Sequence, residues 1–170
     1  MASFMQRLQR QWRHWTTTSG HGRALFTEQA LAALAQAITS GEQRHRGEVR
    51  LIVEHALPSE AIWADVTMRQ RALALFAEYG VWDTEDNCGV LLYVNLAEHK
   101  VEIVTDRHIA RKIDPSTWQQ VCRTMTDGFA KGAFGASTLA AIEQVNGLLT
   151  THFPASGARS NELPDRPIML

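Results

Sequence analysis

The 170-residue sequence has only two cysteines, Cys88 and Cys122, and neither belongs to a Cys-x-x-Cys pair. A scaffold built on disulfides is therefore excluded. The sequence also has no apolar run long enough to span a bilayer, and its basic N-terminal stretch lacks the short apolar core of a secretory signal. From these absences we expect a cytoplasmic protein.

Acidic residues are absent from the first 26 positions, which carry four arginines, at Arg7, Arg10, Arg13 and Arg23. That segment has a charge of +4, whereas the remainder has 13 basic and 18 acidic residues and a charge of −5. The net charge of −1 argues against a general nucleic-acid binder. The hydrophobic content of 45% is enough for one domain with a substantial core.

Apolar spacing predicts an amphipathic helix over 4–15, followed by a linker over 16–22. Thr27 is expected to cap the next helix, and Asp114-Pro115 to begin a later helix with a core stripe of Trp118, Met125 and Phe129. The other expected elements are a strand at 48–55, a long helix from Pro58 to Gly80, strands at 89–96 and 101–105, and a last helix after a glycine-containing break at 128–135.

A strand–helix–strand unit followed by a hairpin implies a small, mostly parallel sheet that ends in an antiparallel hairpin. With helices on both faces, the predicted fold is a three-layer α/β/α sandwich. We divide the chain into a basic amphipathic arm with its linker (1–22), an α/β domain (23–153) and an irregular C-terminal tail (154–170).

Carboxylates flank the predicted hairpin at both ends. Asp83, Glu85 and Asp86 precede its first strand, and Asp106 follows its second strand. Antiparallel pairing would place Asp106 opposite Gly89.

A right-handed crossover would start the first strand, with Glu48, at the same edge of the sheet. Such carboxylates repel one another unless a cation lies among them, and hard oxygen ligands suit Ca²⁺ or Mg²⁺. The alternative is that they are ordinary solvated turn residues. If the residues bind a metal, the sequence predicts a Ca²⁺ or Mg²⁺ site formed by Glu48, Asp83, Asp86 and Asp106.

Three stretches resemble the TPM-domain family, namely 69–109, 47–54 and 152–165. The matching positions are Arg71, Ala72, Leu75-Phe76, Gly80, Thr84, Gly89-Val90-Leu91, Asp106, Ile109 and the ending Asn161-Glu162-Leu163-Pro164. Cys88 stands where the family pattern has Asn, and His108 where it has Gly. The resemblance implies calcium binding or acid phosphatase activity, and membrane-associated assembly roles. The ending resembles the soluble bacterial branch, which implies a membrane-anchored partner of the same family.

Two functions remain open. The first is a calcium-binding α/β domain that acts as a membrane-associated binding or assembly module. The second is a metal-assisted acid phosphatase acting on phosphomonoesters, with a cationic clamp drawn from Arg44, Arg46, Arg107, Arg111 and Lys112. No dedicated nucleophile or base can be named, so the binding module is preferred. His55, His99 and His108 do not form a zinc set.

The N-terminal arm allows two interpretations. Its stripe of Phe4, Leu8, Trp12 and Trp15 could lie on an anionic membrane surface, with arginines toward phosphate. The same stripe could instead pack on the body of the domain. The first interpretation predicts that residues 1–18 attach the protein peripherally to the inner face of a membrane.

Overall fold

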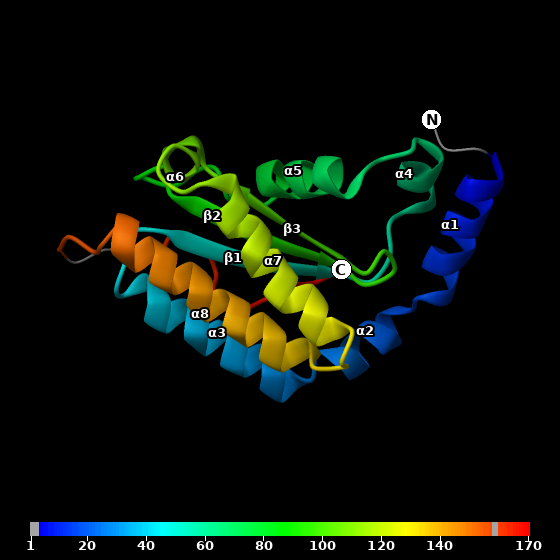
Figure 1. The fold of residues 1–170 in the computed structure, drawn as a ribbon, viewed down its shortest axis with the longest axis horizontal. Coiled ribbons are helices and arrows are strands. Elements are labelled where there is room, and N and C mark those ends of the chain that lie inside the picture. The colour runs from blue at the N-terminus through cyan, green and yellow to red at the C-terminus, as the bar shows by residue number, and fades with distance from the viewer. Residues whose placement is uncertain (1–3, 158–159) are drawn as a thin grey trace.

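The computed structural model describes residues 4–157 and 160–170, and the predicted fold class is confirmed (Figure 1). The helices are α1 Phe4–Thr16, α2 Ser19–Leu25, α3 Glu28–Glu42, α4 Ser59–Trp63, α5 Met68–Glu78, α6 Arg107–Ala110, α7 Pro115–Phe129 and α8 Phe134–His152. The strands are β1 Glu48–Glu54, β2 Gly89–Asn95, β3 Lys100–Thr105 and β4 Ile168–Met169.

The sheet has the order β3-β2-β1-β4 and divides the core into two layers. β1 is parallel to β2 and β4, and β2 is antiparallel to β3. One face packs against α3, α7 and α8, and the other face against α5 (Figure 1). Every residue of β1 and β2 is buried, as expected for parallel strands covered on both faces.

Side-chain caps set several helix starts. The Thr27 hydroxyl accepts a hydrogen bond from Ala30 N at the start of α3, and the Asp114 carboxylate accepts one from Ser116 N at the start of α7. The single long helix expected over 58–80 is wrong, because the chain breaks between α4 and α5. Thr67 begins α5 with a capping box.

The expected linker and tail also differ from the structure. Residues 19–25 form α2, because Phe26 is buried against Phe129 and Phe134 and this packing outweighs the poor helix propensity of two glycines. The C-terminal tail is largely irregular, but Ile168 and Met169 pair with Ile52 and Val53 and cover the edge of β1. Within the described residues, no helix is long and apolar enough to cross a bilayer.

Candidate functional site

The register of the strands brings acidic residues together at one edge of the sheet, called here the acidic edge. Glu48 lies opposite Gly89 in the parallel β1–β2 pair, and the antiparallel pair brings Asp106 beside the same glycine. Asp106 N donates to Gly89 O over 2.9 Å. A Cβ atom on Gly89 would lie 1.9 Å from the carbonyl oxygen of Val81, so this close approach requires glycine.

The Asp106 carboxylate is held at this edge by the backbone. Its Oδ2 accepts a hydrogen bond of 2.9 Å from Gly89 N. Burial raises the pKa of Asp106, and the hydrogen bond from Gly89 partly opposes the rise. This carboxyl group therefore exchanges its proton at a higher pH than an exposed aspartate does.

Glu48 fixes the C-terminal tail to the same edge. Its buried carboxylate accepts hydrogen bonds through Oε2 from Glu162 N, at 3.3 Å, and from Leu163 N, at 3.1 Å. Glu162 in turn accepts through Oε2 from Glu85 N over 2.9 Å. The Asn-Glu-Leu-Pro ending therefore links the C-terminal tail to β1 and to the loop that carries Glu85.

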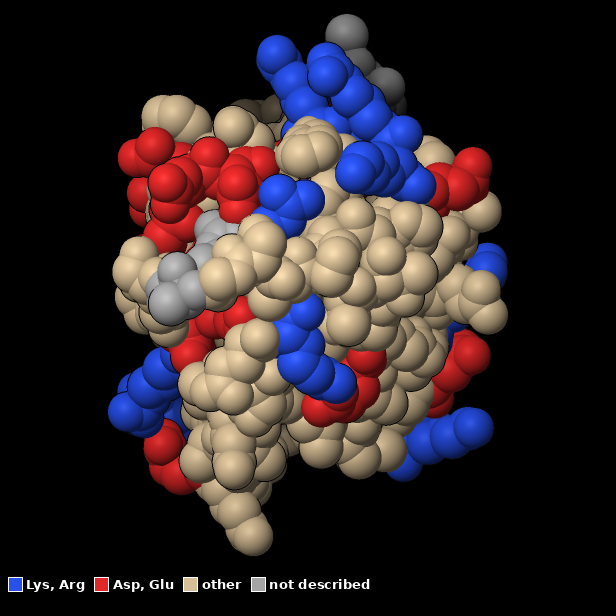
Figure 2. All heavy atoms as spheres, turned by 90° about the vertical axis from the view of Figure 1, so that its left-hand side faces the viewer, with Lys and Arg blue, Asp and Glu red and all other residues tan. Residues whose placement is uncertain are grey.

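The remaining predicted ligands lie nearer the surface. Asp83 is exposed, and Asp86 is partly buried with its Oδ1 3.9 Å from Arg46 Nη1. Figure 2 shows this end of the molecule, where acidic side chains gather beside a separate group of basic ones. The register thus brings the four predicted ligands to one end of the sheet.

Their side chains, however, do not fit a common ion as they are placed. In the described ranges 4–157 and 160–170, no three His, Cys, Asp or Glu side chains are grouped so that they could hold a metal. Glu48 and Asp106 instead accept backbone N–H groups. Calcium binding by Glu48, Asp83, Asp86 and Asp106 therefore stays a prediction.

The two departures from the family pattern contact each other. His108 Nδ1 lies 3.9 Å from Cys88 Sγ and 3.2 Å from the carbonyl oxygen of Asp86. The edge of the imidazole also meets the ring of Phe153, with centroids 5.1 Å apart. In this arrangement His108 packs against the protein and completes the buried surroundings of Cys88.

A cleft of about 780 Å³ opens beside Asp106. Arg107, Arg111 and His108 line it together with an apolar group of Leu73, Phe76 and Trp82. The cleft combines a carboxylate, two cations and an apolar wall, which suits an anionic ligand with an apolar part.

The other proposed clamp residues lie elsewhere. Arg44 Nη2 is 3.4 Å from Glu143 Oε2, and Lys112 Nζ lies 4.9 Å from the Phe153 ring centroid. Arg46 faces Asp86, as described above. Only Arg107 and Arg111, of the five candidates, line the Asp106 cleft.

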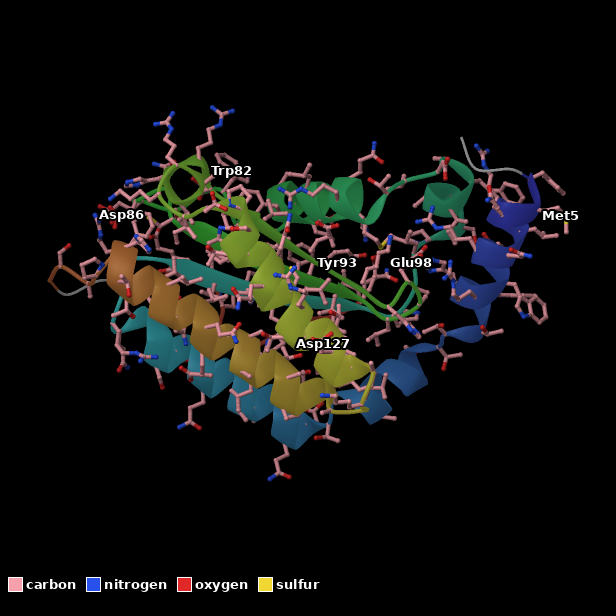
Figure 3. All side chains as sticks on the ribbon, viewed as in Figure 1. Met5, Trp82, Asp86, Tyr93, Glu98 and Asp127 are labelled. Atoms are coloured by element: carbon pink, nitrogen blue, oxygen red, sulfur yellow. The ribbon has the colours of Figure 1, made fainter. Side chains whose placement is uncertain are left out.

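A second polar centre lies at the opposite end, where α1 contacts the hairpin (Figure 3). Glu98 accepts hydrogen bonds through Oε1 from Arg10 Nε and from His14 Nε2, the latter over 2.9 Å. Arg13 Nη2 lies 3.4 Å from the other carboxylate oxygen. The hydrogen bond from His14 and the nearby arginines lower the pKa of Glu98 to about 2.

The same helix is tied to the segment after α4. Leu57 N donates to His14 Nδ1 over 2.9 Å, so the proton of the neutral imidazole resides on Nε2. Arg10 Nη2 donates to Val66 O over 2.8 Å, and Arg7 Nη1 to Trp63 O over 3.2 Å. The basic face of α1 is therefore its inward face.

The apolar face of α1 consequently points outward. Trp12 is 65% exposed and Trp15 76% exposed, and Phe4, Met5 and Leu8 are also exposed. Figure 3 shows Met5 on the side of α1 away from the sheet. The sequence-based alternative in which this stripe packs on the body is wrong, because ion pairs to Glu98 hold the opposite face.

Sequence reasoning missed a partly buried acid, Glu42. Its Oε1 accepts from Val49 N over 2.8 Å, and in its protonated form the carboxyl group can donate a hydrogen bond to Asp165. Burial, opposed by the Val49 hydrogen bond and reinforced by Glu48 and Asp165, raises the pKa of Glu42 to about 9. Glu42 and Glu48 line a cleft of about 370 Å³ at the acidic edge. No local sequence pattern marks Glu42 as unusual.

The arrangement defines an α/β/α domain with an acidic sheet edge and an outward-facing amphipathic helix. The family model for the TPM domain matches residues 22–148, and the chain belongs to the TPM-domain family.

A solved structure supports the fold assignment. The NMR structure of the BA42 protein from the psychrophilic bacterium Bizionia argentinensis is similar, with a TM-score of 0.75 and 23% sequence identity. The match covers 85% of this chain and 94% of that chain. At this identity the similarity shows the fold alone. No curated protein sequence matches the chain significantly.

Proposed function

We propose that this TPM domain is a membrane-associated binding module that contacts a lipid surface through the apolar face of α1. The observation that carries the proposal is the inverted packing of α1, whose arginines bind the body while Phe4, Trp12 and Trp15 face solvent. Such an apolar face on a surface helix is the form that interfacial helices take. The family resemblance adds a membrane-anchored relative as the expected partner.

The structure changes the expected lipid dependence. Arg7 and Arg10 lie against Asp65 and Glu98 of the body, and only Arg13 keeps half of its side chain exposed. Apolar insertion therefore contributes more than attraction to anionic lipid. Binding should occur on phosphatidylcholine vesicles, increase modestly with phosphatidylglycerol, and weaken only slightly with salt.

Vesicle co-sedimentation tests this proposal. The double substitution Trp12→Ala and Trp15→Ala should abolish binding without lowering stability, because both side chains are exposed. Trp82→Ala is a matched control, since Trp82 is similarly exposed but lies at the other end of the molecule (Figure 3). Equal binding by the double variant and the wild type would place the lipid contact elsewhere.

A second candidate, hydrolysis of phosphomonoesters, is favoured by the cleft at Asp106. Arg107 and Arg111 would hold phosphoryl oxygens, and the Asp106 carboxylate, with its raised pKa, would accept a proton from the attacking water. Release of phosphate from p-nitrophenyl phosphate, with and without Ca²⁺, tests the activity. Arg111→Gln should reduce it at least tenfold, whereas the exposed control Arg44→Gln should not.

A further inference from the structure

The outer edge of β3 is a strand edge without a neighbour in the described sheet. β3 is the terminal strand and pairs only with β2. Because antiparallel pairing alternates, and Asp106 N bonds inward to Gly89 O, the backbone groups of Val101, Ile103 and Thr105 point outward. The Ile103 carbonyl agrees with this outward direction, since it accepts a hydrogen bond from Arg69 Nη1 of α5 and none from β2.

A groove of about 640 Å³ follows this edge. One wall is formed by the three β3 residues whose backbone groups point away from β2, namely Val101, Ile103 and Thr105. Trp118 and Cys122 of α7 form the other wall. The groove therefore offers the outward backbone groups of Val101 and Thr105 beside an apolar surface, with the Ile103 carbonyl between them covered by Arg69. Such an arrangement suits an added strand.

Trp118, which lines the groove, carries a polar atom without a partner among the described residues. Its side chain was expected to be core and is indeed buried, at 9% exposure. Its indole Nε1, however, is buried without any hydrogen-bond partner among the described residues. Tryptophan Nε1 is only a donor, and an unpaired buried donor costs free energy until an acceptor such as a peptide carbonyl arrives.

The charged residues that line the groove indicate which charge a ligand should carry. Arg69 and Arg123 line it, and Glu102 is the acidic residue among its lining residues. Arg69 Nη1 lies 3.7 Å from Glu102 Oε2 and also covers the Ile103 carbonyl. Such a cation protects an edge strand from promiscuous pairing, and it can turn toward a carboxylate on an incoming chain.

We propose that this groove, which is independent of the α1 face, binds an extended acidic segment of a partner protein as an added strand beside β3. The segment pairs with the backbone of Val101, Ile103 and Thr105. One of its carbonyl groups accepts from Trp118 Nε1, and its carboxylates contact Arg69 and Arg123. Positive charge at the groove and the unpaired donor together favour an acidic strand over an uncharged one.

The test uses the full-length ¹⁵N-labelled protein and a capped Glu-Val-Glu-Val-Glu-Val peptide. The backbone amides of 100–105 and one of the five tryptophan indole signals should shift saturably. The outward amides of Val101 and Thr105 should also become protected from hydrogen exchange. A Glu-Pro repeat, which lacks strand donors, and a Lys-Val repeat, which reverses the charge, should each bind at least tenfold more weakly.

Two variants assign the contacts. Trp118→Phe removes the unpaired N–H together with part of the buried indole ring, so it should lower stability modestly and weaken binding at least tenfold while the protein stays folded. Val101→Pro removes an outward amide without breaking a bond to β2 and should do the same. Trp82→Phe is the matched control and should bind like the wild type.

Several results would overturn the proposal. These are shifts confined to other surfaces, no shift with any of the three peptides up to millimolar concentration, or equal binding of the Glu-Val and Glu-Pro repeats. Concentration-dependent self-association of Arg69→Ala through β3, without peptide binding, would show that the edge recognises a second copy of this chain and would also refute an acidic partner segment.

Discussion

Replacing Glu42 with Gln removes a carboxyl group that the fold keeps protonated at neutral pH. The pKa of Glu42 is about 9 in the folded protein, against an ordinary value of 4.5. The folded state therefore binds one more proton than the unfolded state between these values, and the stability of the wild type falls as pH rises through this window. Gln keeps the acceptor for Val49 N and has no proton to lose.

The magnitude follows from the pH distance. In the unfolded chain Glu42 has its ordinary pKa of 4.5, so pH 7 lies about 2.5 pH units above it and the carboxyl group is ionised. Keeping the group protonated in the folded state therefore lowers the free energy of unfolding of the wild type by up to about 3 kcal/mol at this pH. At pH 5 the same cost is below about 1 kcal/mol. Glu42→Gln should therefore raise the melting temperature by roughly 6–12 °C at pH 7, and much less at pH 5.

Thermal and urea unfolding at pH 5, 6, 7 and 8 would measure this difference. Glu143→Gln is a suitable control, because Glu143 is an exposed glutamate whose ion pair with Arg44 lies at the surface. Its effect should be small at every pH. A difference between Glu42→Gln and the wild type that does not change with pH would show that Glu42 is ionised in the folded protein and would refute the reasoning.

Three further changes test other parts of the structure. Glu98→Gln removes the charge that holds Arg10 and His14, so α1 should become more susceptible to limited proteolysis while the body keeps its fold. Gly89→Ala should destabilise the protein by several kcal/mol in urea unfolding, because its Cβ would meet Val81 O at 1.9 Å. Calorimetry with Ca²⁺ should show a binding heat that Asp106→Asn diminishes, and identical heats in both proteins would contradict the predicted calcium site.

The fold was predictable where local patterns agree with tertiary packing. The apolar runs of β1 and β2 indicated buried parallel strands, and the hairpin spacing placed Asp106 beside Gly89. Asp114-Pro115 marked the start of α7 because its cap is local. In contrast, β4 is only two residues long and depends on β1, so no local pattern revealed it.

The candidate site was predictable only as a location. Strand register brought the carboxylates to one edge, but the direction of each side chain depends on distant partners such as Leu163 N, which takes up Glu48. The amphipathic pattern of α1 likewise identified two faces without telling which one packs inward. Glu98 decides that question, and it lies far from α1 in the sequence.

The pairing of β4 with β1 has a consequence for biosynthesis. Val53 O accepts from Leu170 N, and His55 N donates to Leu170 O, so the edge of β1 is covered by the last residues of the sequence. Most of the chain separates these two strands, which makes this contact slow to form. During translation β1 and β2 can pair as soon as the hairpin emerges, while the other edge of β1 stays open until residue 170 leaves the ribosome. A nascent or C-terminally clipped chain would therefore present an apolar strand edge, which chaperones bind and other chains can extend.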